Sequence, residues 1–156
     1  MVSNLLQFPH LIPEDMRVDC LRRGLTDLES PYYILSACVG MQRLTLKDSE
    51  WEQCFDALKQ ACLHEIGIVA MRAFMTLQPR LRHPNHTRFI TDILRRPKSS
   101  LFQNALTWLI IQVQSKTEIM KTLNEAGISL EATQRAEAIL DEHLTIQGCG
   151  KSWRSF

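Results

Sequence analysis

The side chains best suited to metal chemistry lie between Cys62 and His86. His83 and His86 stand in one short loop that contains Pro84, and Cys62 and His64 precede them. A zinc site needs about four convergent ligands, usually marked by closely spaced cysteines and histidines. The chain has no CxxC and no HExxH. We therefore expect these histidines to be solvated, and we expect no metal and no cofactor.

No pattern in the sequence predicts covalent catalysis or nucleotide chemistry. A nucleophilic Ser or Cys needs a base and an orienting acid, and neither GxSxG nor a phosphate-binding glycine loop occurs. Cys149, beside Lys151, is the thiol best placed to react, although a plain tail is the simpler interpretation. The carboxylates are dispersed and form no acid–base pair. We therefore expect no enzymatic activity. A small helical enzyme is the alternative, ranked third after the two binding functions described below.

The charge of the chain is unevenly distributed. Residues 80–98 hold six basic side chains against Asp92 alone, a net charge of +5, whereas the whole chain carries +1. The basic residues are Arg80, Arg82, Arg88, Arg95, Arg96 and Lys98. The segment predicts an anion-binding surface, for an acidic protein or for a phosphate backbone; a solvated surface is the plain alternative. Phe89 is its one aromatic residue and its spacing indicates core, which disfavours nucleic acid.

The C-terminal residues 148–156 are predicted to be a tail that carries interface anchors. Trp153 and Phe156 stand on either side of Arg154, and large aromatic side chains and arginine are typical of interface hot spots. The alternative is that Trp153 folds back onto the body of its own chain.

Three stretches that are apolar on almost every side are predicted to form the spine of the fold. They span residues 31–42, 66–78 and 101–112, and a helix that is apolar all round is buried on several faces. A bend is expected near residues 63–65, because an unbroken helix from 49 to 78 would be about 45 Å long at 1.5 Å per residue. The side chains expected to be buried are Ala70, Phe74, Leu77, Trp108 and Ile111.

Shorter signals mark the remaining elements. Pro9 and Pro13 predict an extended N-terminal arm over residues 1–13, lying on the first helices. A helix over 14–25 should turn Met16 inward, and Gly40 in mid-helix predicts a close backbone approach. Capping boxes are predicted at Ser49/Glu52 and Ser115/Glu118, and a helix C-terminus at Gly127.

Composition places these helices in a single globular domain. With 156 residues, 45% hydrophobic and 22% charged, the chain predicts one all-α domain over residues 14–147. No apolar run is long enough for a membrane span, and the N-terminus lacks the basic region of a signal peptide. Five cysteines without a CxxC, three of them at apolar helix positions (Cys20, Cys38 and Cys62), predict reduced core thiols. We expect a cytoplasmic protein.

The three spine helices are weakly similar to one another. Residues 34–42, 70–78 and 104–112 align at offsets of 36 and 34 and each ends in glutamine. Over residues 14–146 this pattern resembles HEAT- or armadillo-type repeats. The resemblance implies about eight helices, arranged as antiparallel hairpins in a right-handed stack with a concave protein-binding surface. A compact helical bundle without true repeats is the alternative.

These observations together favour an α-helical protein-interaction module without enzymatic activity. It would be a scaffold, adaptor, chaperone or accessory subunit that binds the acidic surface of another protein through a helical face and the basic segment. A nucleic-acid-binding accessory subunit that uses the same arginines is the alternative.

Overall fold

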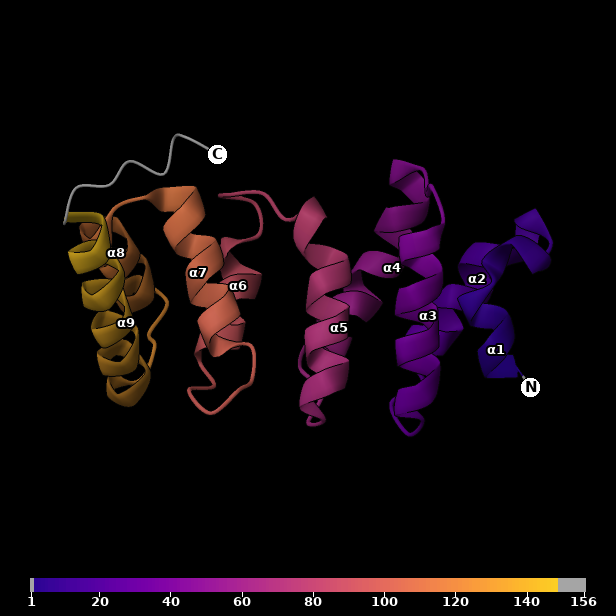
Figure 1. The fold of residues 1–156 in the computed structure, drawn as a ribbon, viewed down its shortest axis with the longest axis horizontal. Coiled ribbons are helices and arrows are strands. Elements are labelled where there is room, and N and C mark those ends of the chain that lie inside the picture. The colour runs from indigo at the N-terminus through magenta and orange to yellow at the C-terminus, as the bar shows by residue number, and fades with distance from the viewer. Residues whose placement is uncertain (1, 149–156) are drawn as a thin grey trace. The chain divides into compact units, whose positions relative to one another are not determined.

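The computed structural model describes residues 2–148, with side chains described for residues 4–143. Every regular element in this range is helical, which confirms the all-α prediction (Figure 1). No helix in this range is both long and apolar enough to cross a bilayer. The α-helices are α1 (Val2–Gln7), α2 (Glu14–Thr26), α3 (Pro31–Arg43), α4 (Asp48–Ala61), α5 (Gly67–Leu77), α6 (Thr87–Leu94), α7 (Phe102–Val113), α8 (Lys116–Glu125) and α9 (Leu130–Gly148). Two short 3₁₀ helices, η1 (Pro9–Leu11) and η2 (Gln78–Arg80), complete the set.

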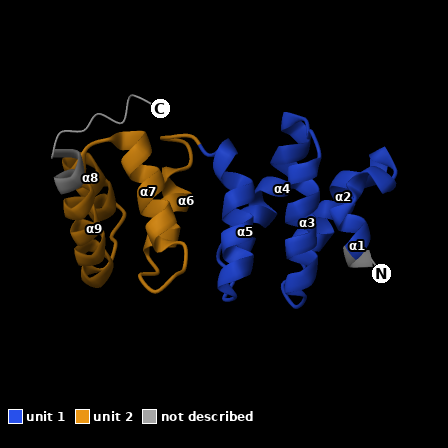
Figure 2. Cartoon of the chain, in the orientation of Figure 1, with its two compact units in different colours: residues 1–81 blue, residues 82–156 orange. Residues whose placement is uncertain are grey.

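The chain forms two compact units, which are described separately. Unit 1 comprises residues 1–81 and unit 2 residues 82–156 (Figure 2). The single domain predicted over residues 14–147 spans this division and stays a prediction.

Unit 1 contains two pairs of consecutive helices. α2 contacts α3 and α4 contacts α5, while α2 also contacts α4 and α3 also contacts α5. Corresponding helices of the two pairs therefore lie next to each other (Figure 1). Gln42 Nε2 donates a hydrogen bond to Thr76 Oγ1 at 3.2 Å and joins α3 to α5. This pairing within unit 1 is typical of stacked helical hairpins; the HEAT-like stack of the whole chain stays a prediction.

The spine of unit 1 is buried where the sequence predicted it. Phe74 and Leu77 are fully enclosed and Ala70 is buried. α4 ends at Ala61 and α5 begins at Gly67, so the expected bend is confirmed. In α2 the prediction for Met16 is wrong, because that side chain is exposed. Met16 lies about 140° around the helix from buried Leu21, at 3.6 residues per turn.

The N-terminal segment is helical, so the prediction of an extended arm is wrong. Pro9 begins η1 instead of breaking all helical structure, since proline is well tolerated in the first turn of a helix. The segment does lie on the first helices: α1 contacts both α2 and α3, and Leu6 is buried. At the crossing, a Cβ on Gly40 would come within 2.0 Å of the Leu6 carbonyl oxygen. This confirms the close backbone approach predicted at Gly40.

In unit 2, α6 contacts α7, α7 contacts α8, and α8 contacts α9. Trp108 is buried as predicted. The prediction that Ile111 is buried is wrong, because its side chain is 58% exposed. The buried face of α7 passes through Phe102, Leu106 and Leu109. Two residues beyond Leu109, Ile111 points about 200° away from that face.

Polar side chains cap the starts of α4 and α8, and a glycine follows the end of α8. Ser115 Oγ accepts a hydrogen bond from the Glu118 backbone N–H at 3.3 Å, which confirms Ser115 as the cap of α8. Gly127 has a φ of +65° and ends the same helix as predicted. The box predicted at Ser49/Glu52 is displaced, because α4 begins at Asp48 and the Glu50 carboxylate accepts from the Lys47 N–H at 2.6 Å.

The cysteines of unit 1 are free thiols that differ in burial. Cys38, Cys54 and Cys62 are buried, and Cys20 is partly exposed. Burial raises the pKa of Cys38 and of Cys54 to about 11 and raises that of Cys62 further.

We therefore expect selective alkylation in the folded protein. In a Cys149→Ser background, Cys20 should react with a maleimide at pH 7.5, because the other three thiols are enclosed and little ionised. Mass spectrometry of the native protein should find one label, and in denaturant four. Labelling of Cys38 at the rate of Cys20 would show that α3 is not enclosed as described.

Candidate protein-interaction surface

A row of apolar side chains is exposed along α3 and α5. Tyr32 is 66% exposed, Ile68 67% and Met75 53%. Three further apolar side chains are partly exposed: Leu35 and Val39 on α3, and Met71 on α5. We call these six side chains the α3–α5 face. Exposed apolar groups that cluster in this way mark binding surfaces, whereas single exposed apolar residues are ordinary.

Helical periodicity explains why these six side chains share one face. On α3 the exposed series Tyr32, Leu35, Val39 repeats at i, i+3 and i+7, while Ile34, Cys38 and Met41 point into the core. Ile68, Met71 and Met75 occupy the same spacing on α5. Each member lies 36 residues after its counterpart on α3, which is the first offset of the sequence repeat. The repeat therefore places the two rows on adjacent helices.

A cavity of about 390 Å³ lies at the C-terminal ends of α3 and α5. Met75 and Gln42 line it, together with Trp51 of α4 and Arg80 of η2. The Arg80 guanidinium lies over the Trp51 ring at 4.9 Å, and its Nη1 pairs with Asp48 Oδ1 at 2.6 Å. Since Met75 belongs both to this cavity and to the α3–α5 face, one cation borders the apolar row.

The structure divides the predicted basic segment between the two units. Arg80 belongs to unit 1, and the other five basic residues belong to unit 2. The side chains of these five are exposed: Arg82, Arg88, Arg95, Arg96 and Lys98. Arg95 is also tied to its own unit, because its Nε lies 3.4 Å from Asp92 Oδ1 and its Nη2 donates to the Ala126 carbonyl at 2.6 Å.

Arg95 caps the C-terminal end of α8. The last carbonyls of this helix accept from the chain that follows: Ile128 N–H donates to Leu123 O at 3.2 Å and Gly127 N–H to Asn124 O at 3.0 Å. Arg95 supplies a donor, and a positive charge, for the Ala126 carbonyl at the negative end of the helix dipole.

We accordingly expect Arg95→Glu to destabilise unit 2. From sequence alone, reversal of Arg95 and Arg96 is predicted to leave the melting temperature almost unchanged, because exposed charges contribute little. A carboxylate in place of Arg95 would instead face a helix carbonyl, with a loss of about 1 kcal/mol. The measurement is the melting temperature of the Arg95→Glu variant. Lys98→Glu is the control variant, because Lys98 is an exposed basic residue four positions before α7. Equal melting temperatures would contradict a capping role.

The other predicted site residues do not converge. His64 Nδ1 accepts from the Ile66 N–H at 3.0 Å, and His86 Nδ1 from the Arg82 N–H at 2.7 Å, so both rings complete local turns. Within the part of the chain that the structure describes, no group of three His, Cys, Asp or Glu could hold a metal ion. Trp153, Arg154 and Phe156 lie outside the described residues, as does Cys149.

The sequence predicts a helical binding face without naming the residues of the α3–α5 face. The signal was present, because the alignment at offset 36 pairs exposed positions as well as buried ones. Comparison of the chain with known protein families, with curated proteins and with solved structures finds no match.

Proposed function

We propose that this chain is a protein-interaction module without enzymatic activity, and that the α3–α5 face binds a segment of another protein. The observation that supports the proposal is the double row of exposed apolar side chains on two adjacent helices. Scaffold, adaptor, chaperone and accessory subunit are all roles that such a face can serve. The buried, un-ionised thiols fit a reducing compartment, and we place the protein in the cytoplasm.

The chemistry of the face favours an amphipathic helix as the bound segment. Anchors at i, i+3 and i+7 on two neighbouring helices present two apolar rows, against which a helix can lay its apolar side. Methionine adapts its shape to different partners, and Met71 and Met75 both belong to the face. At one end of the face Arg80 pairs with Asp48, so the apolar side chains supply the main contacts to the partner.

Site-specific crosslinking tests this proposal. A photoreactive amino acid at Ile68 should crosslink a discrete partner in the native host, because that side chain is the most exposed member of the α3–α5 face. The same group at Asp56, exposed on α4, is the matched control. Tyr32→Glu combined with Met75→Glu should abolish the adduct without lowering the melting temperature. Equal crosslinking from both positions, or an adduct that survives the double substitution, would contradict the proposed face.

The alternative function, nucleic-acid binding, is supported by the five exposed basic residues of unit 2. Phosphate contacts release counterions, so the logarithm of affinity should fall with log salt by about 0.9 per contact on duplex. We expect oligonucleotides to bind with a Kd above about 10 μM at physiological salt, outside the usual specific range. Submicromolar binding at 150 mM salt, lost on Arg88→Glu with Lys98→Glu, would favour this alternative.

A further inference from the structure

One charged side chain, Arg72 of α5, lies among the apolar side chains of the α3–α5 face. Arg72 follows Ile68 by four residues and precedes Met75 by three, so on a helix it is the neighbour of both exposed side chains. The Arg72 side chain itself is partly buried. The sequences of α3 and α5 contain no acidic residue, and their other charged residue is Arg43.

Arg72 lies on the side of α5 that faces α3. Thr76, one turn further along α5, accepts a hydrogen bond from Gln42 of α3 at 3.2 Å. Burial raises the pKa of the Cys38 thiol on α3 to about 11, although the Thr76 side chain and the positive charge of Arg72 act in the opposite direction. Arg72 is therefore close to α3, and its charge lies between the two apolar rows.

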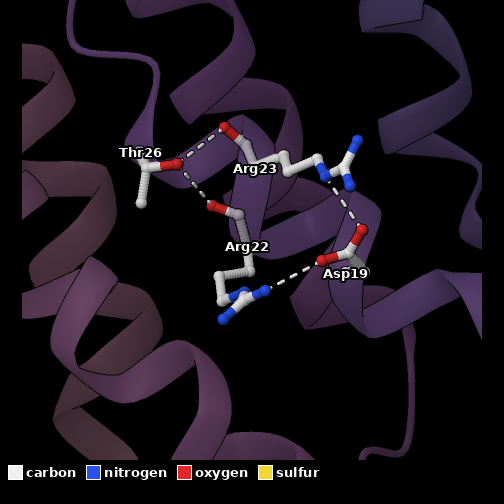
Figure 3. Close-up of polar contacts among 4 residues, drawn as sticks. All are labelled: Asp19, Arg22, Arg23 and Thr26. Carbon is white, nitrogen blue, oxygen red and sulfur yellow. Dashed lines mark hydrogen bonds and ion pairs between the residues drawn. The ribbon is translucent and has the colours of Figure 1, made fainter.

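The other arginines of unit 1 are bound within the chain. On α2, Arg22 and Arg23 share one carboxylate: Asp19 Oδ1 lies 2.9 Å from Arg22 Nη2, and Asp19 Oδ2 lies 2.8 Å from Arg23 Nε (Figure 3). Three more are held by backbone carbonyls or by an aspartate: Arg17, Arg43 and Arg80. Among residues 4–143, Arg72 is the arginine of unit 1 whose guanidinium has neither a hydrogen-bond acceptor nor a carboxylate.

A partner that covers the α3–α5 face would remove the Arg72 guanidinium from water. Burying a charge is costly unless an opposite charge or hydrogen-bond acceptors are buried with it. Since residues 4–143 provide no counter-ion for Arg72, the partner has to provide one. A carboxylate is the best match, because it accepts two parallel N–H bonds from one guanidinium.

The charge pattern disfavours two other occupants of the face. In a symmetric dimer the face would meet a second copy of itself, and α3 and α5 offer no carboxylate to Arg72. A membrane of acidic lipids would meet Glu29 and Glu65 as well, which stand exposed just before α3 and α5. One carboxylate at one point complements this pattern, whereas a uniformly negative surface does not.

On the basis of the function proposed above, we infer that the helix bound at the α3–α5 face carries an aspartate or glutamate in the middle of its apolar stripe, and that this carboxylate pairs with Arg72. The apolar side chains on either side of the carboxylate pack against the rows on α3 and α5. A charge pair at the centre of an apolar contact fixes the register of the bound helix, because a shifted helix would leave both charges unpaired.

Substitution of Arg72 in the full-length protein tests the inference, with crosslinking from Ile68 in the native host as the readout. Arg72→Glu should reduce the adduct about tenfold or more, because two carboxylates then face each other. Arg72→Met makes the face more apolar, and yet it should reduce the adduct several-fold, because the partner's carboxylate loses its counter-ion. Arg23→Met removes an arginine from the Asp19 pair instead, and as the matched control it should leave the adduct unchanged.

The crosslinked segment, identified by mass spectrometry, supplies the probe for a second measurement. Its sequence should contain an aspartate or glutamate between apolar residues at helical spacing. A synthetic peptide of this segment and a version with lysine in place of that carboxylate are compared by fluorescence anisotropy. The lysine version should bind the wild-type protein about tenfold more weakly than the natural peptide does, and Arg72→Glu should restore its binding, as in a charge swap.

Several outcomes would overturn the inference. They are an adduct that Arg72→Met leaves unchanged or strengthens, a crosslinked segment without a carboxylate in its stripe, and an adduct with a second copy of this chain. Cosedimentation with phosphatidylglycerol vesicles that Arg72→Met abolishes would favour a membrane instead. A lower melting temperature of Arg72→Met would show that Arg72 has a structural partner in its own chain. Failure of the wild-type protein to crosslink from Ile68 contradicts the proposed function itself, so the two failures are distinguishable.

Discussion

Replacing Phe74 with alanine is expected to lower the free energy of unfolding by about 3–5 kcal/mol, the range for deleting a fully enclosed aromatic side chain. Phe74 has no exposed surface and lies in α5, which contacts both α3 and α4. The substitution removes a whole ring where three helices meet, and the surrounding backbone can close the space only in part. Urea unfolding followed by circular dichroism measures the loss.

Met75→Ala is the matched control for this change. Its side chain is the next residue of the same helix but is 53% exposed, so the loss should be about 1 kcal/mol or less. If Phe74→Ala also costs less than about 1 kcal/mol, then α5 is not the central helix of unit 1.

Replacing Gly40 with alanine should separate α1 from α3. The new Cβ would lie 2.0 Å from the Leu6 carbonyl oxygen and 3.1 Å from Leu21 Cδ2. Neither the α1 backbone nor a fully buried leucine can yield cheaply, so the loss should be at least the 1–3 kcal/mol or so typical of overpacking. The change also raises helix propensity, by about 1 kcal/mol, so destabilisation would show that the contact outweighs it.

Hydrogen exchange shows where the Gly40→Ala effect lies. Amides of α1 should lose protection, while α4 and α5 should keep most of theirs, because the clash is with Leu6. Val39→Ala, partly exposed beside Gly40, is the control and should leave α1 protected. An alanine variant with native stability and a protected α1 would show that the two backbones are not in contact.

The sequence predicted the parts of the fold that depend on local chemistry. Ser115 at the start of α8 and Gly127 at its end act within one turn, and both are found where predicted. The buried ring of Phe74 followed from a stretch without a polar side. The predictions that Met16 and Ile111 are buried were wrong. An apolar residue near a helix end fits either face of the helix, and only the neighbouring helices decide which face is covered.

The candidate sites depend on contacts between distant residues, and the sequence shows these poorly. Arg95 caps α8 through the carbonyl of Ala126, 31 residues later, and no spacing rule connects the two residues. The contact of α1 with α3 at Gly40 is also between distant residues, and the prolines favoured an extended arm instead. The α3–α5 face was predictable in part. The repeat pairs its residues at offset 36, but the sequence does not show that these side chains are exposed.

The contact between Leu6 and Gly40 also sets an order of events during synthesis. A six-residue helix such as α1 is not stable alone, because helix nucleation is unfavourable and a short segment forms too few hydrogen bonds. Its docking surface includes Gly24 and Gly40, which the ribosome adds 18 and 34 residues after Leu6. The nascent α1 segment must therefore stay unfolded, with its leucines available to chaperones, until α3 has left the exit tunnel.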